Sequence, residues 1–235
     1  MKKYILITAL LITFKGVAQD IDTFFSKTDA FLKANVANGK VAYSKIHANQ
    51  DILNALLDLV KSITASESDA KIYQAFWINA YNIATIKGIV DNYPTRSPLD
   101  NSGFFDKTTY NIAGKNVTLN DIENKILRAK FRDPRFHFVL VCGAIGCPPL
   151  ISEAYMPKTL DAQLDRQTKI AINGNFIKVN IKKKRVEGSE ILKWYKEDFV
   201  MNGDEIDFLN TYRTEKIPNN FKLTYFTYNW KLNKQ

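Results

Sequence analysis

The order of apolar and polar residues along the chain predicts helices and strands intermixed throughout. Helices are expected over 21–36, 50–63, 68–92, 120–128, 159–172, 190–200 and 204–213. Strands are expected over 41–46, 108–112, 115–118, 136–142, 176–181, 184–187 and 221–232. There is no regular βαβ alternation and no low-complexity linker. The pattern therefore predicts a single α+β domain with a helical N-terminal half and a mostly antiparallel sheet.

The helix expected over 68–92 is apolar on nearly every face, which is typical of a buried helix. Ser66 is a candidate cap for its start. Asn79 and Asn82 lie three residues apart on one face of it. Buried amides need hydrogen-bond partners, so this pair either ties down a neighbouring loop or lines a polar site.

The first eighteen residues have the pattern of a secretory signal. Lys2 and Lys3 precede an apolar run, and a small-residue cleavage site ends at Ala18. The run is shorter than the roughly 20 residues of a membrane-spanning helix. The alternative is an N-terminal buried helix or an uncleaved anchor. We expect a signal peptide over 1–18, a domain over 19–235, a secreted protein that is periplasmic or extracellular, and no stable membrane insertion after cleavage.

Charge and composition narrow the possible functions. The 235 residues include 33 Lys+Arg and 24 Asp+Glu, a formal charge of +9. Cleavage after Ala18 would leave +6, and five of the remaining 30 basic residues lie between 178 and 185, at the expected tip of a hairpin. Because no nucleic-acid-binding motif accompanies this charge, we expect no nucleic-acid partner. A hydrophobic content of 46% excludes a disordered chain.

Candidate catalytic chemistry is concentrated between Glu123 and Cys147. A cysteine nucleophile needs a base and often a third group that orients the base. One hypothesis is therefore a cysteine hydrolase or an acyl or peptidyl transferase, with Cys147 as nucleophile, His137 as base and Glu123 orienting His137. Asn79, Asn82, Arg128 and Cys142 are the candidate pocket-lining residues. A strand over 136–142 would separate its ends by roughly 16 Å, so the following loop would have to fold back to bring Cys147 to His137.

The alternative for the two cysteines is a disulfide. An exported protein meets an oxidising compartment, and Cys142 and Cys147 are close enough in sequence to be bridged. In that case the protein is a non-catalytic envelope module that binds a peptide, glycan or protein through exposed aromatic residues such as Tyr228 and Trp230. The other interpretation of these aromatic residues is that they belong to a core strand. A thiol–disulfide oxidoreductase is less favoured because a C-x-x-C motif is missing. Phosphate-loop and dinucleotide motifs are missing too, so we expect no cofactor. We also expect no metal, because Cys142, Cys147 and His137 lack the spacing of a standard zinc site.

Several segments of the sequence resemble one known family. They are 75–82 (AFWINAYN), 119–128 (LNDIENKILR), 133–142 (DPRFHFVLVC), 146–150 (GCPPL) and 194–199 (WYKEDF). The sequence resembles the family called domain of unknown function 547 over roughly residues 40–200. The resemblance singles out Glu123, His137, Cys142 and Cys147 but implies no proven role for any of them. Residue types and their order, with the histidine before the cysteine, suggest a link to papain-like thiol enzymes.

Overall fold

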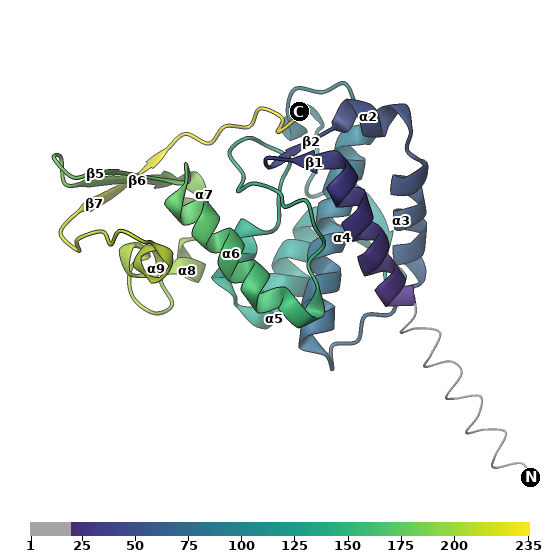
Figure 1. Ribbon diagram of the computed structural model, residues 1–235, viewed down its shortest axis with the longest axis horizontal. Coiled ribbons are helices and arrows are strands. Elements are labelled where there is room, and N and C mark those ends of the chain that lie inside the picture. Colours follow the sequence, from purple (N-terminus) through teal and green to yellow (C-terminus); the bar gives the residue numbers. More distant parts are fainter. Residues whose placement is uncertain (1–19) are drawn as a thin grey trace, which may run out of the picture.

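The computed structural model describes residues 20–235 and has an α+β fold, as the sequence predicts. The N-terminal half is mainly helical, and the three-stranded sheet lies in the C-terminal part of the chain (Figure 1). The predicted signal peptide, residues 1–18, lies outside the described residues.

Helices make up most of the regular structure. The α-helices are an unlabelled one over 20–35, then α2 (Tyr43–Ala48), α3 (Asp51–Ser62), α4 (Ala70–Asp91), α5 (Ala129–Phe131), α6 (Leu160–Asn173), α7 (Glu190–Trp194), α8 (Lys196–Phe199) and α9 (Glu205–Tyr212). The other helices are three 3₁₀ helices, η1 (Pro98–Asp100), η3 (Pro134–Phe138) and η4 (Pro157–Thr159), and a π-helix, η2 (Asp121–Arg128).

The strands form three small sheets in the described part of the chain. Two are antiparallel pairs, β1 (Val36–Ala37) with β2 (Lys40–Val41) and β3 (Thr109–Ile112) with β4 (Lys115–Thr118). The third has the order β5-β6-β7, with bounds Ile177–Asn180, Arg185–Ser189 and Lys222–Phe226. β5 and β6 are antiparallel, whereas β6 and β7 are parallel. The strand pairing is therefore mostly antiparallel, as predicted, and it is distributed over two hairpins and a separate mixed sheet.

Helix α4 is at the centre of the larger core. Most of its residues from Tyr73 to Val90 are buried, including Asn79 and Asn82, which agrees with its apolar residues on every face. Its cap is Asp69, not Ser66: the Asp69 side chain accepts hydrogen bonds from the backbone N–H groups of Lys71 and Ile72. A charged cap at a helix N-terminus is also favoured by the helix dipole.

A second, smaller core lies beneath the three-stranded sheet. It includes Phe138, Val186, Phe199 and Leu209. Cys147 packs against both cores, so the loop that carries the cysteines lies at their boundary. The C-terminus returns to the N-terminal half, where the Gln235 N–H donates to the Val41 carbonyl over 3.0 Å. The two halves are thus joined by the end of the chain as well as by the cysteine loop.

Two expected strands are wrong. Over 41–46 only Val41 is in a strand, and α2 begins at Tyr43. Over 136–142 there is no strand: η3 covers the first part, and an irregular segment follows it. Pro134 fits the first turn of η3, and the Asp133 side chain caps that turn by accepting from the Arg135 N–H. An apolar run of this length in the sequence does not distinguish a buried strand from another buried segment.

Two further segments are shorter than expected. The helix expected over 190–200 is divided at Tyr195 into α7 and α8. The strand expected over 221–232 ends at Phe226, after which the backbone is irregular. The remaining expected helices and hairpins are confirmed within a few residues at their ends.

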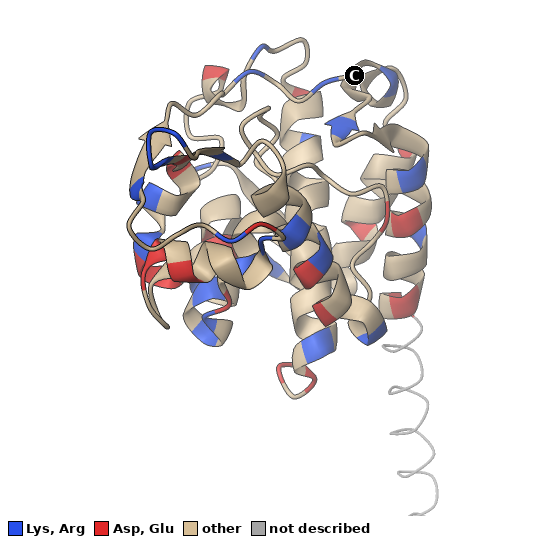
Figure 2. Cartoon of the chain, turned by 60° about the vertical axis from the view of Figure 1, so that its left-hand side comes forward, with Lys and Arg blue, Asp and Glu red and all other residues tan. Residues whose placement is uncertain are grey.

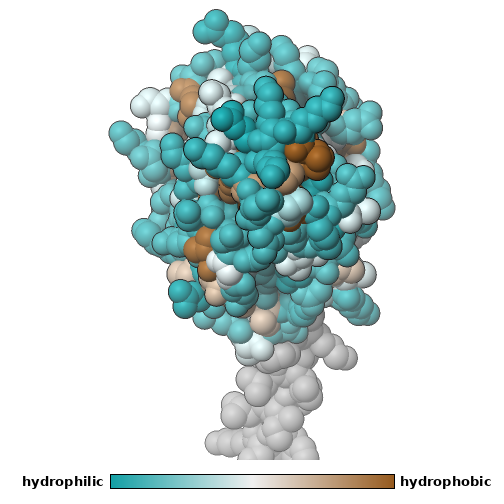
Figure 3. All heavy atoms as spheres, turned by 90° about the vertical axis from the view of Figure 1, so that its left-hand side faces the viewer, coloured by the Kyte–Doolittle hydropathy of each residue, from teal (hydrophilic) through white to brown (hydrophobic). Residues whose placement is uncertain are grey.

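The surface has no single dominating feature. Acidic and basic residues are interspersed in Figure 2, and a run of basic residues forms the exposed tip of the β5–β6 hairpin. On the face shown in Figure 3, hydrophobic residues appear as separate spots among hydrophilic ones. No helix among the described residues is both long and apolar enough to cross a bilayer.

Candidate functional site

One pocket brings together most of the residues that the sequence singles out. It has a volume of about 310 Å³. Glu123 of η2, His137 of η3 and the two cysteines all line it. Six aromatic side chains complete much of the wall, namely Tyr81, Phe105, Trp194, Tyr195, Tyr228 and Trp230. We call this cavity the aromatic pocket.

His137 is held from several sides. Its side chain is buried, and its Nε2 lies 2.6 Å from Oδ2 of Asp198. The Tyr195 ring stacks on the imidazole with centroids 4.1 Å apart. Nδ1 lies 3.9 Å from Oε1 of Glu123, beyond hydrogen-bond distance. Asp198, and not Glu123, is therefore the carboxylate that orients His137.

Asp198 also has a cationic partner, Arg128. The Arg128 Nε donates to the same Asp198 oxygen over 2.7 Å, and the guanidinium carbon lies 4.7 Å from the centroid of the Tyr195 ring. Burial by itself would raise the pKa of Asp198, but the hydrogen bonds from His137 and Arg128 outweigh it and lower the pKa to about 2. Arg128 thus contacts Asp198, the partner of His137, and does not itself line the pocket.

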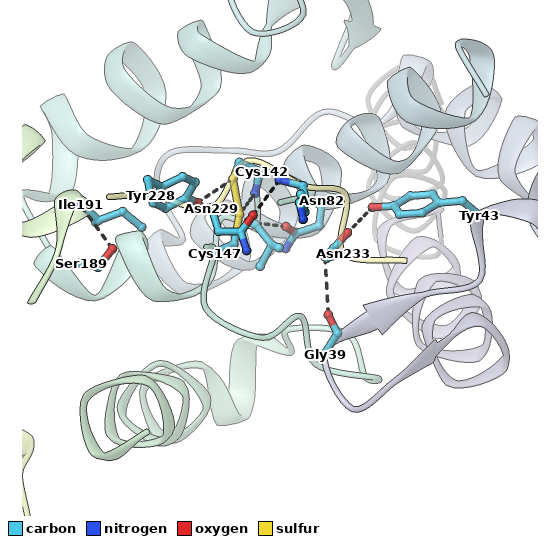
Figure 4. Close-up of a disulfide and its surroundings, with 12 residues drawn as sticks. Gly39, Tyr43, Asn82, Cys142, Cys147, Ser189, Ile191, Tyr228, Asn229 and Asn233 are labelled. Atoms are coloured by element: carbon cyan, nitrogen blue, oxygen red, sulfur yellow. Dashed lines mark hydrogen bonds between the residues drawn. A yellow bond between two sulfur atoms is a disulfide. The ribbon is translucent and has the colours of Figure 1, made fainter. Parts of the chain in front are cut away.

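The two cysteines are bonded to each other. Their Cα atoms are 6.3 Å apart, within the normal range for a disulfide. The Tyr228 hydroxyl lies 3.0 Å from Sγ of Cys142 and 3.1 Å from Sγ of Cys147 (Figure 4). Since disulfide sulfurs carry no hydrogen, the tyrosine is the donor. The backbone N–H of Cys142 also donates to Sγ of Cys147 over 3.1 Å.

The C-terminal segment holds the cysteine loop against the pocket. The N–H of Ile145 donates to the Lys231 carbonyl over 2.7 Å, and that of Gly146 donates to the Asn229 carbonyl over 2.8 Å. A Cβ at Gly146 would lie 2.9 Å from atoms of the Tyr228 ring, closer than real Cβ contacts. Glycine at this position therefore lets the ring of Tyr228 reach the disulfide.

Asn79 and Asn82 do not line the aromatic pocket. Each side-chain amide forms hydrogen bonds with one backbone carbonyl and one backbone N–H group of a loop. Asn82 donates to the Val139 carbonyl and accepts from the Val141 N–H, both over 2.9 Å. Asn79 makes the same pair of bonds to Tyr155, over 2.8 and 3.0 Å. Asn82 thus provides the hydrogen bonds that a neighbouring strand would give to 139–141.

Sequence reasoning missed Asp198, Tyr195 and Trp194 as site residues. All three belong to the segment 194–199, whose resemblance to a known family was the available signal. The binding-module hypothesis needs Tyr228 and Trp230 exposed, but Tyr228 is buried and Trp230 is half-buried. The described residues contain no cluster of His, Cys, Asp and Glu that could hold a metal ion.

The chain is thus an α+β protein with an aromatic pocket that contains a disulfide and a histidine–carboxylate pair. The model of the family described as "Protein of unknown function, DUF547" matches residues 65–170. That match confirms the resemblance to the DUF547 family over this part of the chain. It begins before α4 and ends within α6, so Asp198 and the C-terminal wall of the pocket lie outside it. Neither the curated proteins nor the solved structures contain a significant match.

Proposed function

We propose that this protein is an exported binding module whose ligand occupies the aromatic pocket. The observation that carries the proposal is the composition of the pocket wall, in which six aromatic rings surround Glu123 and His137. Small-molecule sites are concave, largely apolar and supplied with a few convergent polar groups. The disulfide supports the proposed export, because such bonds persist in oxidising compartments.

Two tryptophans of the pocket allow a direct test. The chain has three tryptophans. The third, Trp77 of α4, is buried in the protein core and serves as an internal control. In ¹H–¹⁵N NMR spectra recorded with a set of small fragments, we expect ligands to shift the indole signals of Trp194 and Trp230 and to leave that of Trp77 unchanged. If no fragment moves the first two signals, or if all three move together, the binding proposal fails.

A second candidate is thiol chemistry after the disulfide is reduced, as in a hydrolase or an acyl or peptidyl transferase. The specific observation is that Cys147 shares the pocket with His137, which is already oriented by Asp198. The Cys142 N–H and the Tyr228 hydroxyl both lie 3.1 Å from Sγ of Cys147. Hydrogen bonds to a thiolate favour the charged, nucleophilic form of the sulfur.

Selective alkylation distinguishes the two sulfurs. Dithiothreitol reduces the bond to two thiols and is itself oxidised to a cyclic disulfide. We then expect iodoacetamide at neutral pH to modify Cys147 several-fold faster than Cys142, as measured by peptide mass spectrometry. Because the Tyr228 hydroxyl contacts both sulfurs, a Tyr228→Phe variant should slow the alkylation of both thiols, whereas Tyr225→Phe, which changes a tyrosine of β7 outside the pocket, should not. Equal rates at the two thiols in the wild type would contradict the thiol candidate without affecting the binding proposal.

A further inference from the structure

The charge of the aromatic pocket differs from that of the protein around it. The chain has an excess of basic residues, with 33 Lys+Arg against 24 Asp+Glu. Among the described residues, neither Lys nor Arg lines the pocket, and Glu123 is its only Asp or Glu. Such a wall has no Lys or Arg to repel a cation and offers one anionic group. The pocket therefore favours positively charged ligands over negatively charged ones.

In the described part of the chain, Glu123 has no Lys or Arg within salt-bridge distance, although its charge and that of Arg128 interact over a longer distance. Its only ion-pair neighbour within 4 Å is Nδ1 of His137, at 3.9 Å. Burial is the main cause that raises the pKa of Tyr195 above its usual value, and the nearby Glu123 carboxylate raises it further. Asp198, by contrast, is neutralised by Arg128. The Glu123 side chain lines the cavity and is only 14% exposed, so it has little access to bulk water.

Three aromatic rings next to the disulfide complete the site. The centroids of Trp194 and Tyr228 are 5.0 Å apart, those of Tyr228 and Trp230 are 4.7 Å apart, and the two indoles are 6.0 Å apart. All three line the pocket, and Trp194 is 45% exposed at its rim. Aromatic faces attract cations, tryptophan most strongly, and the attraction grows when water is excluded.

We propose that the ligand of the aromatic pocket is a small organic cation with an ammonium group, bound between the Glu123 carboxylate and the rings of Trp194, Tyr228 and Trp230. This inference rests on the proposed binding function and specifies its ligand class. The cavity of about 310 Å³ accommodates a small headgroup rather than a polymer chain. The carboxylate supplies the opposite charge, and the rings replace the water that an alkylated ammonium loses.

An isosteric pair of probes tests the charge alone. Choline and 3,3-dimethylbutan-1-ol have the same shape, but only choline is a cation. By calorimetry and by the Trp194 and Trp230 indole signals, we expect choline to bind at least about tenfold more tightly than the alcohol. Equal affinities would overturn the inference and leave the binding proposal standing. Binding of neither probe would also overturn it, while the fragment experiment independently decides whether the pocket binds ligands.

Matched variants locate the binding site of the cation. Glu123→Gln should weaken choline binding about tenfold and leave the alcohol unchanged, whereas Glu215→Gln, at an exposed position outside the pocket, should affect neither probe. Trp230→Leu should weaken both probes. Unchanged choline affinity in Glu123→Gln would overturn the proposed site. The comparison of the two probes in the wild type stands even if a variant fails to fold.

Discussion

Replacing Asn82 by leucine is expected to lower the free energy of unfolding by about 4 kcal/mol. The side chain is 2% exposed and satisfies two buried backbone groups, the Val139 carbonyl and the Val141 N–H. Leucine has a similar size but pairs with neither group. Each buried polar group left unsatisfied costs roughly 1–3 kcal/mol, so both losses act together on a segment that no strand supports.

Urea unfolding followed by circular dichroism measures this loss. Asn54→Leu is the matched control, because Asn54 lies on the exposed face of α3 and the same substitution there removes no buried hydrogen bond. We expect its stability to change by no more than about 0.5 kcal/mol. If Asn82→Leu loses less than about 1 kcal/mol, the two amide bonds do not support the 139–141 segment in the way the structure indicates.

Replacing Asp198 by asparagine is expected to remove a large acid-dependent part of the stability. The folded protein holds the pKa of Asp198 at about 2, below its usual value of 3.8. Because the folded pKa is the lower one, this contribution is present above about pH 4 and is lost as the pH falls toward 2. It amounts to about 2 kcal/mol at neutral pH. The variant should be less stable at pH 7 and should show a smaller fall in stability between pH 4 and 2.

The design of this experiment must account for the titration of Asp121. Its pKa is also about 2, mainly because Lys125 donates a hydrogen bond to it, with further bonds from Thr118. It therefore titrates over the same pH range. Wild type and variant are best compared in an Asp121→Asn background, with the free energy of unfolding measured at intervals between pH 2 and 7. Parallel curves with and without Asp198 would show that the His137–Asp198–Arg128 contacts do not stabilise the fold.

The sequence allowed much of the fold to be predicted because the elements concerned have strong local signals. Helix α4 is recognisable by its length and its apolar residues on every face, and the β3–β4 hairpin by its central Ala113-Gly114 turn. The expected strand over 136–142 failed for a physical reason. Its apolar residues are buried, as predicted, but their backbone partner is the side chain of Asn82, which is 57 and 59 positions away from them in sequence.

The candidate site was predictable in its residue types but not in its pairings. Glu123, His137, Cys142 and Cys147 were selected from the sequence, and the structure brings all four to one pocket. It assigns the orienting carboxylate to Asp198, which lies 61 positions after His137. A pairing over such a distance leaves no periodic signal, because it depends on how α8 packs against η3.

The sequence by itself determined the α+β class, the buried central helix, the family resemblance and the small set of reactive residues. Local propensity and apolar spacing suffice for these. Only the tertiary structure decided between a free thiol and a disulfide, between Glu123 and Asp198 as partner of His137, and between a surface stripe and a pocket wall for Tyr228 and Trp230. Each of these depends on distances between segments far apart in the chain, which are fixed by the packing of the two cores around the cysteine loop.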